Sequence, residues 1–197
     1  MCSSDLAAIA ASGFPVKVVP TFRPDVAGKV HLPEKVRPWA RRLADLSGIA
    51  TDTHAGLLAA LAARHADFAA AGCRASDHGL DMLSATHLTD AEADAIWRRT
   101  LAGTAATPEE ASGFATHVVL HVARLNHARG FVTQLHLGPF RDPNPPLARR
   151  LGADSGCDTI GDLPQGPGLV RFLGRLADED TLGRTILYNI NPRSEEP

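Results

Sequence analysis

A histidine and an arginine lie close together at the end of one short alternating segment. Residues 131–137 alternate apolar with polar side chains, which is typical of a half-buried strand, and Gly138-Pro139 must end it. His136 is therefore predicted at the carboxyl end of a strand, with Arg141 on the loop that follows. In barrels and sheets of alternating strands and helices, that end collects binding and catalytic groups. A structural histidine with a satisfied partner is the alternative.

An acid and a base are neighbours in a second segment. Residues 73–80 are too short for a helix and are interrupted by Gly79, so they predict a buried strand whose end presents Ser76, Asp77 and His78. Asp77 and His78 could transfer protons, because carboxylate and imidazole groups both act as general acids and bases. Serine, aspartate and glycine are also ordinary turn residues, so a turn without chemistry is the alternative.

An arginine follows a third predicted strand. Residues 14–19 are largely apolar and β-branched, and residues 20–25 form the loop that ends them. Arg23 precedes Pro24, and a proline favours an extended backbone at the residue before it. A guanidinium held in this way could bind a carboxylate through two hydrogen bonds. The alternative is an ordinary salt bridge at the surface.

Two histidines share one face of a predicted helix. His117 and His121 are four residues apart, which is the spacing that helical zinc sites use. In the metalloprotease version of this motif a glutamate follows the first histidine, whereas Val118 occupies that position here. The pattern therefore does not favour a zinc site at this pair.

Helices and strands alternate along the chain. Capping boxes open two of the helices, at Thr89–Glu92 and Thr107–Glu110. The predicted strands cover residues 14–19, 73–80, 131–137 and 185–190, and the predicted helices cover residues 7–12, 33–47, 54–71, 89–102, 107–129 and 168–178. Residues 138–165 are expected to form a long loop region rich in proline, glycine and aspartate. This order predicts an α/β fold, in which helical crossovers join the strands of a parallel sheet. Four strands cannot close a (β/α)8 barrel, so if the parent protein has that fold, this chain is only part of it.

The composition is that of an ordinary globular domain. The chain has 197 residues, 44% of them hydrophobic, and a formal net charge of −2, so nothing in the charge indicates nucleic acid or a membrane surface as a partner. No apolar run approaches the length of a membrane span, and residues 1–14 lack the basic leader and apolar core of a signal peptide. Three widely spaced cysteines favour free thiols over a disulfide framework. We therefore expect a cytoplasmic location.

The two ends of the sequence have an unusual pattern. Residues 2–6 and 193–196 are what a common short-read sequencing adapter encodes in its reverse-complement and forward senses. We therefore expect residues 1–6 and 193–197 to derive from an adapter, and residues 7–192 to be the central part of one (β/α)8 barrel domain. Genomic sequence that continues through either border would contradict this expectation.

Five segments resemble the uronate isomerase family of the amidohydrolase superfamily. They recur in the family's order and at close to its spacing: FPVKVVPTFRPD (14–25), GCRASDHGL (72–80), QLHLG (134–138) with Arg141, LGADSGCDTI (151–160) and TILYNINP (185–192). The resemblance implies a distorted (β/α)8 barrel that interconverts an aldose uronate and its ketose. It also implies proton transfer between C1 and C2 of the sugar and a divalent metal, often zinc, in the site.

The resemblance also implies roles for individual residues. Arg23 would hold the carboxylate of the substrate, and Arg141 would lie beside the sugar. Asp77 and His136 would face the substrate or the metal, with no division of roles between them. The family's metal ligands are a His-x-His pair after the first barrel strand and an aspartate in an Asp-x-Arg motif on the last strand. Neither motif occurs in this chain, so no metal site is complete, although His136 could supply one ligand.

We therefore expect the parent protein to convert D-glucuronate to D-fructuronate and D-galacturonate to D-tagaturonate, with this chain as its middle portion. Its partners would be the small-molecule uronate and further copies in a homo-oligomer. One alternative is a metal-dependent sugar-acid hydrolase on the same barrel. The other is that the chain alone is catalytically silent, or a binding module for acidic sugars that uses Arg23 and Arg141. A partial barrel would also leave strand edges and apolar faces exposed, so we expect poor solubility or association in isolation.

Overall fold

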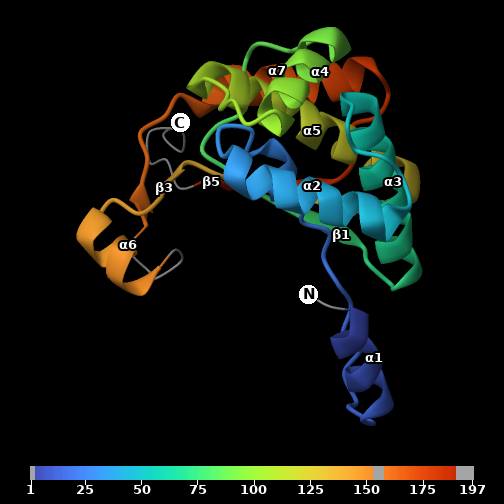
Figure 1. Ribbon diagram of the computed structural model, residues 1–197. Coiled ribbons are helices and arrows are strands. Elements are labelled where there is room, and N and C mark those ends of the chain that lie inside the picture. The colour runs from blue at the N-terminus through green and yellow to red at the C-terminus, as the bar shows by residue number, and fades with distance from the viewer. Residues whose placement is uncertain (1–2, 153–157, 190–197) are drawn as a thin grey trace.

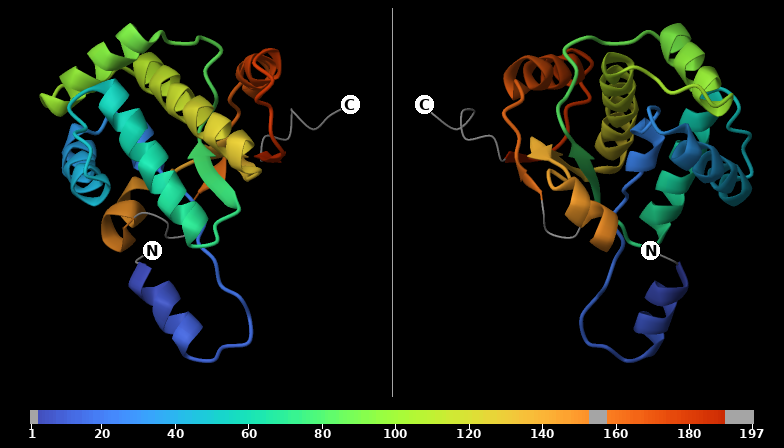
Figure 2. Two further views of the ribbon diagram at one scale, coloured as in Figure 1. Left: turned by 90° about the vertical axis from the view of Figure 1, so that its right-hand side faces the viewer. Right: turned by 60° about the vertical axis from the view of Figure 1, so that its left-hand side comes forward.

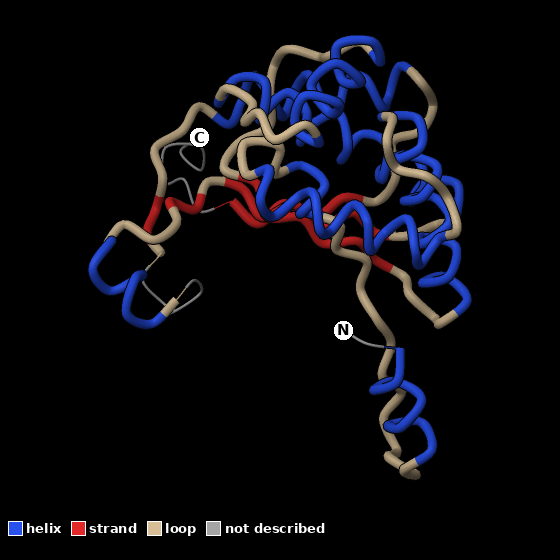
Figure 3. Tube along the Cα trace, in the orientation of Figure 1, coloured by secondary structure: helices blue, strands red, loops and turns tan. Residues whose placement is uncertain are grey.

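A parallel three-stranded sheet forms the framework of the protein. The structure, a computed structural model, describes residues 3–152 and 158–189. Strands β1 (Ala75–Leu80), β2 (Val132–Leu137) and β5 (Thr185–Asn189) lie in the order β1-β2-β5, so that β2 pairs in parallel with both neighbours. In Figure 3 these strands run along one border of the main body. One face of the sheet is therefore covered by helices, and the other is the face on which a site could form.

Five helices make up the layer against the sheet: α2 (Pro33–Ser47), α3 (His54–Ala70), α4 (Asp90–Leu101), α5 (Pro108–Arg129) and α7 (Gln165–Asp178). Figure 2 shows α5 lying along the sheet with α3 beside it. Helix α1 (Ser3–Ala11) stands away from this body, and so does α6 (Pro145–Leu151) (Figure 1). A short 3-10 helix (Asp25–Gly28) leads into α2, and β3 (Pro139–Phe140) pairs antiparallel with β4 (Thr159–Ile160).

Local chemistry fixes the helix ends. Thr89 and Thr107 each accept a hydrogen bond from the backbone of the glutamate three residues later, and that glutamate bonds back to the threonine backbone. Both capping boxes predicted from the sequence are thus confirmed, because they satisfy backbone donors that the first helical turn leaves unpaired. Helix α5 ends at Gly130, whose φ of 67° lies in the left-handed region that glycine adopts without strain.

Two apolar clusters hold the layers together. The larger lies among α2, α3, α4 and α5, where the rings of Trp97 and Phe114 stack with centroids 5.9 Å apart. The smaller joins β2 to α5 and α7, and there Leu135, Leu137 and Phe172 are at most 1% exposed. Burying each such side chain is worth roughly 1.5–3 kcal/mol, so these contacts fix the sheet against its helices.

The predicted strand at residues 14–19 is wrong. This segment is irregular, and Phe14, Val16, Val18 and Val19 are all more than a third exposed. After this segment, Phe22 pairs with β1 through a parallel bridge to Ser76. Pro15 and Pro20 lack the amide hydrogen that a paired strand must donate, which restricts the pairing to the residues after them.

The predicted loop over residues 138–165 is only partly irregular. It contains β3, α6 and β4, and α7 begins at Gln165, three residues earlier than predicted. The predictions for residue 190 and for the end segment 193–197 lie outside the described residues, as do residues 153–157 of the loop. Helix α1 includes residues 3–6, whose origin in an adapter stays a prediction. In the described ranges, no helix is long and apolar enough to cross a membrane.

Candidate functional site

The alternation of side chains along β1 separates two sets of polar residues. Ser76 and His78 are at most 1% exposed and point toward the helical layer, whereas Asp77 points to the opposite face. On β2 the buried Thr133 and Leu135 alternate in the same way with Gln134 and His136. The prediction that Ser76, Asp77 and His78 would be presented together at a strand end is therefore wrong. They lie within the strand, and only Asp77 joins the candidate site.

Asp77 and His136 meet on the face of the sheet that the helical layer leaves uncovered. His136 Nε2 lies 2.8 Å from Asp77 Oδ1, and the two side chains are 44% and 18% exposed. The His136 ring stacks on the ring of Tyr188 from β5, with centroids 4.5 Å apart and planes 12° from parallel. Tyr188 in turn donates a hydrogen bond to Gln134 Oε1. The imidazole is thus held in one orientation beside a carboxylate.

The two predicted arginines converge on the same place. Arg23 Nη1 is 2.9 Å from Asp77 Oδ2, and Arg141 directly follows β3, where Asp158 accepts a hydrogen bond from it. A Cβ atom on Gly79 would lie 2.9 Å from Arg23 Nη2 and 3.6 Å from Arg141 Nη2. Only glycine therefore lets both guanidinium groups approach the strand so closely. All four site residues predicted from the sequence are brought together.

Sequence reasoning missed the groups that hold these four side chains. Asp25 Oδ2 accepts hydrogen bonds from Arg23 Nε and from the amide of Gly79. Burial raises the pKa of Asp25, but contacts with His78, the Gly79 amide and Arg23 outweigh it, so the pKa lies below its ordinary value. Asp158 has a lowered pKa because its carboxylate bonds Arg141. Asp25 does stand two residues after Arg23 in the sequence, which is the one signal that could have indicated it.

A buried chain of polar groups continues from Asp25 into the core. His78 Nδ1 lies 3.3 Å from Asp25 Oδ1, and its Nε2 is 2.8 Å from Ser76 Oγ. Asn126 of α5 then donates hydrogen bonds to Ser76 and Thr133 and contacts His65 Nε2 of α3 through its own oxygen. These hydrogen bonds join β1, which carries Asp77, to helices α5 and α3.

The site does not hold enough ligands for a catalytic metal ion. Asp77 and His136 are suitable donors, but a catalytic zinc ion requires three protein ligands with an open position. The described residues supply only this pair at the sheet. His117 and His121, which the sequence did not favour as a zinc pair, have separate partners, because His121 Nε2 lies 3.2 Å from the Leu58 carbonyl. Burial accordingly lowers the pKa of His121 to about 4.

Three other residues form a group that could hold a divalent metal ion. His54, Asp90 and His117 each offer one ligand atom, and these atoms lie within 4.8 Å of one another. They come from α3, α4 and α5 and not from the strands that carry Asp77 and His136. Of these three residues, sequence analysis singled out only His117, because the members of the group stand far apart along the chain.

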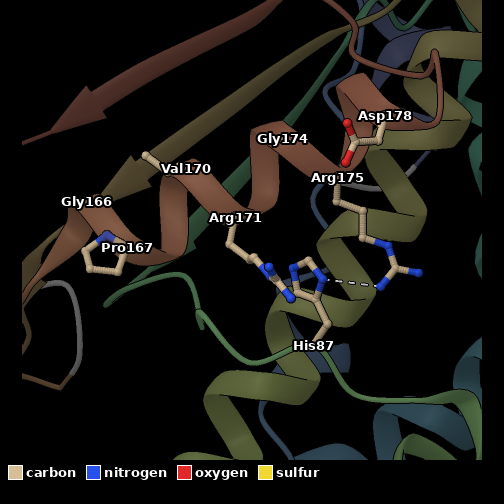
Figure 4. A pocket seen from close by; sticks show the side chains of 8 residues that line it. All are labelled: His87, Gly166, Pro167, Val170, Arg171, Gly174, Arg175 and Asp178. Atoms are coloured by element: carbon tan, nitrogen blue, oxygen red, sulfur yellow. Dashed lines mark hydrogen bonds between the residues drawn. The ribbon is translucent and has the colours of Figure 1, made fainter.

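A groove of about 660 Å3 lies on the outer side of α7. It is lined by His87, Gly166, Pro167, Val170, Arg171, Gly174, Arg175 and Asp178 (Figure 4). Arg175 Nη1 lies 3.3 Å from His87 Nδ1. Burial is the main cause of a lowered pKa at His87, and the charges of nearby arginines lower the pKa further. The groove contains no residue of the Asp77–His136 site, so its size is no argument for placing the chemistry there.

Comparisons with known proteins identify relatives across nearly the whole chain. The family model for glucuronate isomerase matches residues 5–196. A uronate isomerase from Solibacter usitatus is 44% identical over 197 aligned residues, covering 96% of this chain and 41% of the relative. One from Phocaeicola vulgatus is 37% identical, with 94% and 40% covered.

Solved structures agree with this. The crystal structure of uronate isomerase from Thermotoga maritima superposes with a TM-score of 0.86 at 30% identity, over 95% of this chain and 41% of that one. The glucuronate isomerase from Caulobacter crescentus gives the same TM-score at 28% identity, over 98% and 40%. The predicted α/β class, part of a (β/α)8 barrel, is thereby confirmed. The chain spans about 40% of the length of these relatives.

Proposed function

Because the chain belongs to the glucuronate isomerase family, we propose that it forms one portion of the active site of a uronate isomerase. The reaction would interconvert D-glucuronate with D-fructuronate and D-galacturonate with D-tagaturonate. The observation that carries the proposal is the convergence of Arg23 and Arg141 above Gly79, next to the Asp77–His136 pair. Cationic and proton-transferring groups thus lie side by side, as an anionic sugar with a reacting carbonyl requires.

The arginines would bind the carboxylate of the uronate. A guanidinium group matches a carboxylate through two parallel hydrogen bonds, and two such groups leave little freedom for the end of the sugar that they hold. Asp25 and Asp158 fix the directions of Arg23 and Arg141 through their own hydrogen bonds. The sugar would then lie on the uncovered face of the sheet, next to the Asp77–His136 pair.

Asp77 and His136 would together move the proton. Conversion of aldose to ketose removes a proton from C2 and adds one at C1, while the proton on O2 leaves and O1 gains one. Imidazole and carboxylate groups can exchange protons of this kind near neutral pH. The stacking of His136 on Tyr188 holds the ring in place for both transfers. We propose these roles for the pair and do not divide them between its members.

A divalent metal ion, zinc in our proposal, would polarise the sugar oxygens in the full-length protein. His136 and Asp77 are donor types that zinc accepts, and the remaining ligands would come from parts of the protein outside this chain. We also propose a cytoplasmic location and a homo-oligomer. The location rests on the few, widely spaced cysteines, of which Cys73 is buried and unpaired.

The experiment compares the full-length protein with this chain in a coupled isomerase assay on glucuronate and galacturonate. We expect turnover by the full-length protein and none by the chain alone. In the full-length protein, Arg23→Lys should raise KM about tenfold, because a point charge replaces a two-pronged contact. His136→Asn should lower kcat by about 10²–10⁴. Turnover unchanged by both substitutions, or hydrolysis without isomerisation, would refute the proposal.

A further inference from the structure

Three side chains from three helices meet at a place that the proposed reaction does not use. His54 is the first residue of α3, Asp90 is the first residue of α4, and His117 lies in the middle of α5. His117 Nε2 is 3.3 Å from Asp90 Oδ1. Two ligands of a tetrahedral zinc ion, with bonds of about 2.1 Å, lie about 3.4 Å apart. This pair is therefore already at ligand spacing, and His54 completes a group in which one ligand atom from each residue lies within 4.8 Å of the others.

His54 supplies a second, independent observation. Its side chain is only 2% exposed, and its Nε2 is a buried atom without a hydrogen-bond partner in the described part of the chain. Buried polar atoms are normally satisfied, because an unmade hydrogen bond is expensive inside a protein. A bound cation, or a water that the cation holds, would satisfy the imidazole of His54.

The surroundings of His117 also suit a ligand. Its side chain is only 13% exposed, and its ring packs edge-on against that of His54, with centroids 4.8 Å apart. The two imidazoles therefore already lie side by side, and a histidine binds a metal ion through the lone pair of a ring nitrogen.

The charge balance allows a cation of moderate affinity. The positive ends of α3 and α4 oppose a cation at this place. Asp90 offsets this with its own charge, and Asp94 adds a second carboxylate, which accepts a hydrogen bond from the His54 amide. Asp90 is 89% exposed, so it can swing toward a bound ion and leaves a path from solvent.

We propose that His54, Asp90 and His117 bind one divalent cation of the zinc class, which clamps α3, α4 and α5 together. Two imidazoles and one carboxylate form a donor set that favours zinc over calcium or magnesium, because calcium and magnesium prefer oxygen ligands. Water would occupy the remaining position. The site is separate from the proposed reaction, because none of its residues lies on the strands that carry Asp77 and His136.

The test uses the 197-residue chain after treatment with EDTA. We expect isothermal titration with zinc chloride to give one site per chain, and cobalt(II) to develop the visible absorption of a tetrahedral complex. Zinc at 100-fold above its dissociation constant should raise the melting temperature by about 5–10 °C. Asp90→Asn and His54→Gln should each weaken binding at least tenfold.

His121→Gln provides the matched control. His121 lies one turn after His117 on the same helix but contacts the Leu58 carbonyl, so this variant should bind zinc as the unaltered chain does. Asp90 is at the surface, so Asp90→Asn keeps the test decisive even if His54→Gln does not fold. The proposal is overturned if zinc does not bind saturably. Equal binding by Asp90→Asn and the unaltered chain, or loss of binding in His121→Gln alone, would overturn it too.

Discussion

Replacing Asn126 by alanine would test how the helical layer is joined to the sheet. Asn126 is fully buried, its Nδ2 donates to Ser76 Oγ at 2.7 Å and to Thr133 Oγ1 at 2.8 Å, and its Oδ1 lies 2.9 Å from His65 Nε2. Alanine removes all three contacts at once. Each intramolecular hydrogen bond contributes about 0.5–1.5 kcal/mol, and groups left buried without a partner lose more. Ser76 keeps its contact with His78, so we expect a total loss of about 2–4 kcal/mol.

The assay is urea unfolding followed by circular dichroism, at protein concentrations low enough to suppress association. His127→Ala is the matched control, because His127 is the next residue of α5 and is exposed. The control should change the free energy of unfolding by no more than about 0.5 kcal/mol. If Asn126→Ala also stays within that range, the polar chain does not hold the layers together and our account of it is wrong.

Three further predictions concern pH, the site and the sheet edge. The pKa of His121 is about 4 in the folded chain against 6.5 for the free group, so the unfolded chain binds more protons and stability falls as pH drops from 6.5 to 4. His121→Gln should remove roughly 3 kcal/mol of that loss, measured by urea unfolding at both pH values. Gly79→Ala places a Cβ 2.9 Å from Arg23 Nη2 and should raise KM about tenfold in the full-length protein while leaving its melting temperature nearly unchanged. Ile186, Leu187 and Tyr188 on β5 are each more than 40% exposed, so light scattering should show association that grows with concentration; a monomer throughout would contradict this.

Features that depend on neighbouring residues could be predicted from the sequence. The capping boxes at Thr89 and Thr107 act within one turn, and the alternation in residues 131–137 is local as well. Each of these elements was found close to its predicted position. Parallel strands bring the loops that follow them to one edge, which accounts for the place of Arg141. Asp77 lies within β1 and Arg23 follows an irregular segment, so their contact depends on how distant parts of the chain pack.

Features that depend on distant partners could not be predicted. Residues 14–19 have the composition of a strand, but whether a strand forms depends on the amide groups that a neighbour can bond. Ser76, Asp77 and His78 are all polar, so hydrophobicity carries no signal of which one faces the core. His117 and His121 do share a helical face, yet the residues packed opposite, Asp90 and Leu58, decide their separate contacts.

Residues on the two faces of β1 and β2 alternate along the sequence, so neighbouring positions are under two different kinds of selection. In our proposal Asp77 and His136 contact the substrate, whereas their neighbours Ser76 and Leu135 are buried in the packing of the fold. Adjacent codons would therefore be under different constraints. A combinatorial library restricted to the alternate codons on the uncovered face could therefore explore new sugar acids while the scaffold stays constant. Random mutagenesis would also change the buried residues of β1 and β2, so it would destabilise the fold while it varied the uncovered face.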